Sequence, residues 1–173
     1  MNKLKKLLAV TSALLMCSGT LAYMPQDTLI STDTNIVYAA DGSVAINATN
    51  FPDLIFRGYI AGSFDKDKDG ILSAEEIAKA TYISVINSRI SDLTGIDNLI
   101  NLKILDCNNN NLKNLDISNN TELTEFNCSH NKLDSLDISA NTKLTKLYCF
   151  YNKLDTIDIS LNTELKELIC YSN

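Results

Sequence analysis

The sequence lacks tryptophan, contains a single histidine, His130, and has only two prolines and 7% aromatic residues among its 173. One histidine leaves little material for histidine-based catalysis, and the sequence shows no Ser-His-Asp set, paired-carboxylate cleft or phosphate loop. Positive charge is also scarce, because 15 lysines and arginines stand against 21 aspartates and glutamates. The net charge of −6 disfavours binding to nucleic-acid phosphates. We expect neither an enzyme with catalytic residues nor a nucleic-acid partner.

Residues 1–40 have the pattern of a signal peptide and leader. Three lysines, Lys3, Lys5 and Lys6, precede an apolar stretch that is too short to span a bilayer. Small residues allow cleavage near residue 22 or near residue 39, and both sites stay open. Cys17 would suit a lipoprotein site only if Met16 were small. We therefore expect a secreted or extracellular protein, associated with the cell surface or free, with no membrane insertion of the mature chain.

An internal repeat of 21 residues dominates the rest of the chain. Its consensus is L-x-x-L-x-C-x-x-N-x-L-x-x-L-D-I-S-x-N-T-x, and a degenerate earlier turn covers residues 82–101. One such turn cannot bury its apolar face alone, whereas stacked turns bury a continuous core. The L-x-x-L-x-C part predicts a short strand with Leu105 and Cys107 pointing inward. The repeats span residues 82–173, and the last one is incomplete.

This repeat resembles the leucine-rich repeat family, whose signature is L-x-x-L-x-L-x-x-N/C-x-L. It is similar in particular to the internalin-like secreted repeat proteins of Gram-positive bacteria. The resemblance implies an α/β repeat fold, a solenoid whose parallel sheet lines the concave face, where ligands are usually held. Cysteine in the second inward strand position is a departure, since leucine is commoner there.

Four cysteines recur at this position, and their spacing restricts their chemistry. They are Cys107, Cys128, Cys149 and Cys170. Neighbouring strands lie about 4.8 Å apart, so one tetrahedral metal cannot reach the outer two sulfurs of the column. Parallel Cβ vectors on adjacent strands suit a disulfide poorly, although the Cα separation allows one. We expect buried thiols that pack as small hydrophobes, with adjacent disulfides as the alternative.

Residues 65–76 match a complete calcium-binding loop. Oxygen ligands occupy its ligand positions, and Gly70 permits the sharp turn at the sixth. The predicted ligands are Asp65, Asp67, Asp69, the Ile71 carbonyl, Ser73 and Glu76. Flanking helices are expected, one capped by Asn50 with an apolar face of Phe51, Leu54, Ile55 and Tyr59, and one from Ala74 to about Ala80. The alternative is an acidic surface loop that binds no ion.

This segment resembles the EF-hand superfamily, which implies a Ca²⁺ cofactor. It occurs once, which favours a structural role over a sensor. Dockerin calcium loops are also similar, but they occur as tandem pairs and usually end in aspartate. The resemblance implies that residues 41–81 form an EF-hand-like helix-loop-helix cap, of the kind internalin-like proteins place before their first turn.

Aromatic side chains gather on the last two repeats, in the strand columns that face away from the core and in the turn column that follows them. They are Tyr148, Phe150, Tyr151 and Tyr171. Clustered exposed aromatics are typical anchors for a protein or a sugar ring. The sequence thus favours a non-catalytic binding or adhesion module for a protein or glycan. For the aromatics, the alternatives are that further repeats cover them or that they are ordinary surface tyrosines. For the chain, the alternative is a structural spacer or fragment of a larger surface protein.

Overall fold

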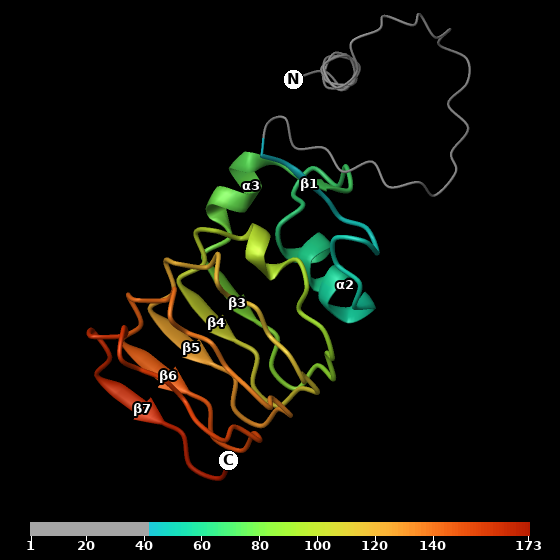
Figure 1. Ribbon diagram of the computed structural model, residues 1–173. Helices are drawn as coiled ribbons and strands as arrows, with labels where there is room; N and C mark the ends of the chain where they lie inside the picture. The colour runs from blue at the N-terminus through green and yellow to red at the C-terminus, as the bar shows by residue number, and fades with distance from the viewer. Residues whose placement is uncertain (1–41) are drawn as a thin grey trace, which may run out of the picture. The chain divides into compact units, whose positions relative to one another are not determined.

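The computed structural model describes residues 42–173, and the expected leader with both cleavage sites lies outside the described residues. The described chain begins with a helix-loop-helix cap and continues into a solenoid of stacked turns (Figure 1). The cap contains β1 (Val44–Ala45), α2 (Leu54–Ser63), β2 (Ile71–Leu72) and α3 (Ala74–Lys79).

Helix α2 begins later than the sequence suggested. Its N-cap is Asp53, whose Oδ1 accepts the N–H groups of Ile55 and Phe56 at 2.9 and 3.1 Å. The predicted capping role of Asn50 is wrong, because the Asp53 carboxylate takes these N–H groups and is itself held in place by the Ser91 N–H at 3.0 Å. Asn50 instead donates from Nδ2 to the Ala45 carbonyl at 2.8 Å.

The buried face of α2 also differs from the prediction. Phe56 and Ile60 face the core, whereas Leu54 and Ile55 are 73% and 48% exposed. Phe56 and Ile60 are four residues apart, so they lie on one face of the helix, and that face packs on the core. Phe51, which precedes the helix, is buried as expected and packs edge-to-face on Phe56.

Helix α3 follows the expected pattern. The Ser73 side chain accepts the Glu76 N–H, and the Glu76 carboxylate accepts the Ser73 N–H at 2.9 Å, so both halves of the capping box form. Between the helices, β2 pairs antiparallel with β1, placing Val44 opposite Leu72 and Ala45 opposite Ile71. The cap therefore contains a small two-stranded sheet that the sequence analysis did not predict.

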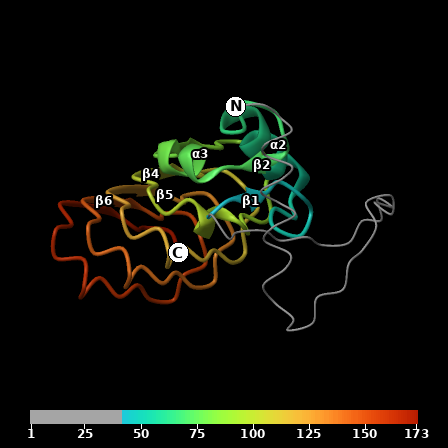
Figure 2. The ribbon, with the colours of Figure 1, turned by 90° about the horizontal axis from the view of Figure 1, so that it is seen from above.

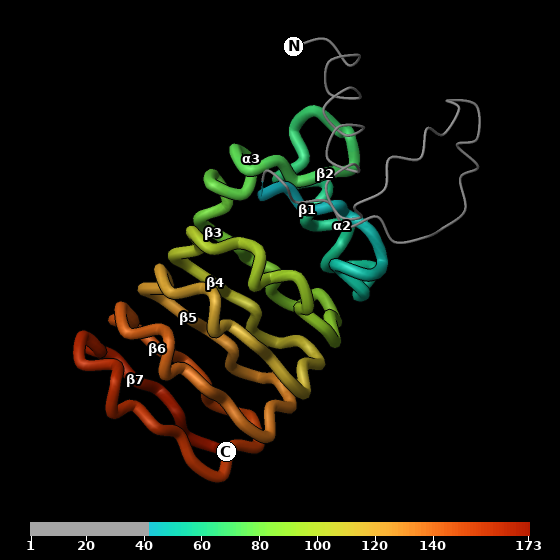
Figure 3. Tube along the Cα trace, turned by 45° about the horizontal axis from the view of Figure 1, so that its top comes forward, coloured from blue at the N-terminus to red at the C-terminus, as the bar shows by residue number. Residues whose placement is uncertain are grey.

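The solenoid is a parallel sheet of five three-residue strands in chain order. The strands are β3 (Tyr82–Ser84), β4 (Ile104–Asp106), β5 (Glu125–Asn127), β6 (Lys146–Tyr148) and β7 (Glu167–Ile169). Each strand pairs in the register of the repeat, for example Leu105 with Phe126. Pairing of β3 with β4 confirms that the degenerate turn belongs to the repeats. The turns lie one behind another, with β7 farthest from α2 (Figures 2 and 3).

The return arms of the turns contain little helix. Within the described part of the chain they are irregular apart from one 3-10 turn, Ile96–Asn98. The α component of the fold is thus concentrated in the cap. Apolar side chains of strands and return arms fill the interior, among them Leu102, Leu105, Phe126 and Leu147.

The cysteine column forms as predicted over its first three members. Cys107, Cys128 and Cys149 are buried free thiols. Burial raises the pKa of Cys107 and Cys128 well above the ordinary value, and that of Cys149 to about 11. Cys170 departs from the prediction, because it is exposed.

Two ladders of asparagine amides hold successive turns together. In the first, Asn131 donates from Nδ2 to the carbonyls of Cys107 and Cys128, both at 3.0 Å, and accepts the Leu112 N–H at 3.0 Å. In the second, on the return arms, Asn141 donates to the carbonyls of Ile117 and Asn120. The repeated asparagines therefore satisfy buried backbone groups where the chain turns.

Candidate functional site

The loop between α2 and α3 brings three of the predicted ligands together. Carboxylate oxygens of Asp65, Asp67 and Glu76 all lie within 4.8 Å of one another. Asp65 is buried, Glu76 is half-buried and Asp67 is exposed. Asp69 instead accepts the Ile71 N–H at 2.9 Å, and Ser73 bonds Glu76.

Backbone N–H groups position these carboxylates. Asp65 accepts the N–H groups of Asp69 and Gly70 at 3.1 and 3.0 Å, and Gly70 has the positive φ of 79° that its turn requires. Glu76 Oε1 accepts the Lys66 N–H at 2.8 Å, which ties the start of the loop to its end. Burial opposes ionisation of Glu76, but the bonds from Ser73 and Lys66 outweigh it and lower its pKa.

This donor set suits a hard divalent cation. All the converging groups are carboxyl oxygen donors, which Ca²⁺ and Mg²⁺ prefer, and no imidazole or thiol is among them. The strand β2 that follows Gly70 is held by β1, and the Ile46 N–H donates to the Gly70 carbonyl at 2.9 Å. Strand β1, which lies outside residues 65–76 in the sequence, thus stabilises the second half of the loop. The short apolar run Val44-Ala45-Ile46 was the only sequence signal for it.

A second candidate is an aromatic cluster at the carboxyl ends of strands β5 to β7. It contains His130, Phe150, Tyr151 and Tyr171. Phe150 stacks on Tyr171 with ring centroids 5.0 Å apart, and His130 lies 4.6 Å from Tyr151. Further edge-to-face contacts join Phe150 to His130 and to Tyr151.

The structure regroups the predicted patch. Phe150, Tyr151 and Tyr171 come together, whereas Tyr148 lies on β6, where a hydrogen bond with Glu167 raises its pKa. His130 was missed as a member, although it occupies the same repeat position as Tyr151 in the preceding turn. That 21-residue correspondence was the signal that could have identified it.

The sheet face beside this cluster is polar. Lys146 on β6 pairs with Glu125 on β5 at 3.0 Å, and both side chains are about two-fifths exposed. Ser129, which occupies the same repeat position as Phe150 and Tyr171, is buried and donates from Oγ to Asn127 Oδ1 at 2.8 Å.

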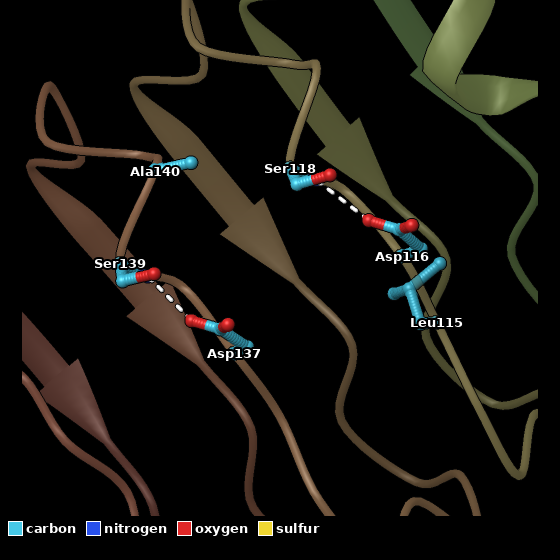
Figure 4. Close-up of a pocket in the computed structure, with 6 residues that line it drawn as sticks. All are labelled: Leu115, Asp116, Ser118, Asp137, Ser139 and Ala140. Atoms are coloured by element: carbon cyan, nitrogen blue, oxygen red, sulfur yellow. Dashed lines mark hydrogen bonds between the residues drawn. The ribbon is translucent and has the colours of Figure 1, made fainter.

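A shallow hollow lies between neighbouring return arms. Asp116 and Asp137 line it, and each accepts the N–H of the serine two residues later, Ser118 or Ser139, at 2.9 Å (Figure 4). These hydrogen bonds lower the pKa of both carboxylates. Both stay ionised near neutral pH, so neither suits the role of a general acid, and the motif serves to turn the chain.

The repeats are similar in sequence and structure to those of known proteins. No family model matches the chain. Internalin J of Listeria monocytogenes serotype 4b is 39% identical over 71 residues, which are 41% of this chain and 8% of that protein. Internalin J of serovar 1/2a is 42% identical over the same length and share.

The solved functional domain of InlJ from Listeria monocytogenes superposes with a TM-score of 0.67 and 40% identity, over 73% of this chain and 28% of that one. The repeats are internalin-like leucine-rich repeats.

The InlJ domain includes a cysteine ladder. Two further Listeria monocytogenes structures, the internalin inlF and internalin C2, superpose with TM-scores of 0.61 at 21% and 19% identity, and they support the fold alone. This chain covers 46% and 60% of them. Between residues 42 and 173, none of the helices has the length and apolarity to cross a bilayer.

Proposed function

We propose that the chain is a secreted, non-catalytic binding or adhesion module that recognises a protein or glycan through the exposed face of its repeats. The observation that carries the proposal is the aromatic cluster of Phe150, Tyr151, Tyr171 and His130, in which Tyr151 and Tyr171 are 48% and 56% exposed. Exposed clustered aromatics supply most of the binding energy in many interfaces. Similarity to internalin J, of which the chain spans only 8%, supports the repeat fold and leaves the ligand as a proposal.

A structural spacer in a larger surface protein is the second candidate. The ion pair of Lys146 with Glu125 neutralises part of the sheet face within the protein itself, which suits a face with no ligand. A dockerin-like attachment role has less support, because the carboxylate loop pairs with β1 rather than with a second loop.

Arrays of extracellular proteins and glycans test the binding function. Saturable binding should weaken at least about tenfold when Phe150 and Tyr171, whose rings stack in the cluster, are both replaced by Ala. The matched control is Tyr82→Ala, since Tyr82 is an exposed tyrosine on β3 at the other end of the sheet. Saturable binding that both variants retain would place the ligand elsewhere, and no saturable binding at all would favour the spacer.

We further propose that the loop holds a structural Ca²⁺ through Asp65, Asp67, Asp69, the Ile71 carbonyl, Ser73 and Glu76. Convergence of three carboxylates within 4.8 Å supports this set, because their mutual repulsion opposes the closed loop and a cation removes it. A site with a Kd of roughly 10⁻⁴ to 10⁻³ M, the range of extracellular modules, would be largely filled outside the cell.

Thermal unfolding tests the calcium site. Calcium at a hundredfold excess over Kd should stabilise the protein by about 2.7 kcal/mol, and equal magnesium should do less. Glu76→Gln should remove most of this effect, because it removes the charge of the carboxylate that joins both ends of the loop. Glu75→Gln is the control, since Glu75 is exposed in the same turn of α3 and pairs with Lys79. Equal melting temperatures with and without millimolar calcium would leave an acidic turn that binds no ion.

A further inference from the structure

One column of residues adopts left-handed backbone at the carboxyl ends of the strands. All five turns place a non-glycine residue there with φ between 52° and 56°. The column is Asn87, Asn109, His130, Tyr151 and Ser172. Asparagine and glycine adopt this conformation most readily, whereas a bulky side chain is strained in it.

Asparagine at Asn87 and Asn109 is therefore the residue that the turn itself favours. The backbone bonds of the turn are the same with either kind of residue. The Asn109 N–H donates to the Ser129 carbonyl at 3.0 Å, and the Tyr151 N–H donates to the Tyr171 carbonyl at 3.1 Å. The backbone hydrogen bonds of the turn therefore do not require a tyrosine at position 151. Strain that the fold does not require is characteristic of functional positions.

The strained aromatic residue lies in the middle of the aromatic cluster. Tyr151 contacts His130, Phe150 and Tyr171, and it is 48% exposed, while Tyr171 is 56% exposed. Strand spacing places the three turns involved within about 10 Å of one another. The left-handed backbone thus presents the rings of His130 and Tyr151 at the sheet edge formed by the carboxyl ends of the strands. At an ordinary strand position these rings would lie on the sheet face.

Positive charge borders the cluster in an otherwise acidic protein. Lys132 and Lys153 are exposed two residues after His130 and Tyr151, and Arg89 is exposed at the corresponding place in the first turn. The Lys132 ammonium donates to Asn111 Oδ1 at 2.7 Å, so this column also follows the stacking of the turns. The nearest carboxylates on these two arms, Asp134 and Asp155, lie two residues farther from the rings.

We propose that this edge binds an acidic segment of a protein partner, with an aromatic or aliphatic side chain seated on the rings and carboxylates facing Lys132 and Lys153. A protein segment fits better than a neutral glycan because it can supply both the apolar side chain for the rings and the carboxylates for Lys132 and Lys153. Tyrosine hydroxyls and lysine ammonium groups supply hydrogen bonds to carboxylates. The inference rests on the proposed binding function and specifies its surface and partner.

The test uses fluorescent synthetic 12-residue peptides and the purified protein. One peptide set combines Tyr or Phe with Asp and Glu, a second replaces the acids by Lys, and a third replaces the aromatics by Ala. Polygalacturonate serves as an acidic polysaccharide probe. The key variants are Tyr151→Asn, which installs the residue that the turn favours, and Lys132→Glu with Lys153→Glu. The controls are Tyr82→Asn and Lys103→Glu, which alter exposed residues away from the cluster.

Only the acidic aromatic peptides should bind, and Tyr151→Asn should weaken their binding about tenfold or more. The melting temperature of the Tyr151→Asn variant should equal that of the original protein or exceed it. If Tyr151 had only a packing role, the substitution would lower the melting temperature. Charge reversal at Lys132 and Lys153 should weaken binding most at low salt.

Three outcomes overturn the inference. Peptide binding that is unaffected by Tyr151→Asn places the partner elsewhere and leaves the binding module standing. Binding of polygalacturonate without the peptides assigns the edge to a glycan. Absence of binding by every probe removes the acidic-segment partner, while the protein and glycan arrays decide the proposed function separately.

Discussion

The Asp53 carboxylate joins the cap to the repeats by bonding Ser91, 38 residues later in the chain. Its Oδ1 caps helix α2, and its Oδ2 accepts the Ser91 N–H at 3.0 Å and the Ser91 hydroxyl at 3.3 Å. Because Ser91 lies in the first turn of the solenoid, one side chain both starts the helix and fixes it against that turn.

Replacing Asp53 by Ala should lower the free energy of unfolding by about 1–2 kcal/mol, through loss of the helix cap and of the bond to Ser91. Asp53→Asn should cost less, because an amide oxygen still accepts the helix N–H groups. Urea denaturation measures both variants. An Asp53→Ala protein as stable as the original would show that water replaces these bonds without cost.

Asp53 should also contribute to acid sensitivity. Burial opposes its ionisation, but the hydrogen bonds from Ser91, Phe56 and Ile55 outweigh this and lower its pKa from 3.8. With the folded pKa below the unfolded one, the stabilisation is complete above pH 3.8 and is lost as the pH falls through the folded pKa. The stability difference between the original protein and Asp53→Asn should therefore shrink below about pH 4, as denaturation at a series of pH values would measure.

At Gly95 the backbone of the first turn lies close to the cap residues Asn50 and Phe51. A Cβ on Gly95 would lie 2.3 Å from the Asn50 carbonyl oxygen and 2.5 Å from the Phe51 ring, at a φ of 99°. Gly95→Ala should destabilise the protein by about 2 kcal/mol or more. Gly58→Ala is the matched control, since no atom lies within 4 Å of its Cβ position in α2, and it should stabilise by about 0.5–1 kcal/mol. Equal melting temperatures of both variants would contradict this account of the junction.

Most of the solenoid could be predicted, because a 21-residue period fixes which positions stack. The inward Leu105 and Cys107, the ladder of Asn131 and the degenerate turn containing Ile83 all follow from register alone. The capping box of Ser73 with Glu76 was equally local. Convergence of Asp65, Asp67 and Glu76 follows from loop spacing, although the bound ion is still a prediction.

The predictions from sequence were wrong or incomplete where tertiary contacts determine the local structure. The α2 N-cap could not be assigned, because Asp53 is fixed partly by Ser91, which is remote in sequence. Pairing of β1 with β2 involves two-residue strands that carry no periodic signal. The membership of His130 in the aromatic cluster depends on a left-handed backbone that directs its ring sideways, and strand alternation alone does not predict that.

The first asparagine ladder should matter more than any surface asparagine. Asn131→Ala would leave the buried Cys107 and Cys128 carbonyls and the Leu112 N–H without their partner, at a cost of about 3 kcal/mol. Asn119→Ala, an exposed position on the return arm, should change stability by less than about 0.5 kcal/mol. Urea unfolding of the two variants measures the difference, and equal stabilities would mean that water satisfies the ladder groups.

Thiol labelling distinguishes the members of the cysteine column. The thiolate is the reactive form, and burial raises the pKa of Cys149 to about 11 and that of Cys107 and Cys128 well above the ordinary value. In the folded protein at pH 8, iodoacetamide should therefore modify Cys170, which is exposed, far faster than the other three. In urea all four should react, and peptide mass mapping separates them from Cys17.

A Cys170→Ser variant should show almost no rapid labelling at Cys107, Cys128 and Cys149. Fast native labelling of Cys128 would mean that the turns open readily, and cysteines that stay unlabelled in urea until a reductant is added would reveal disulfides between adjacent turns.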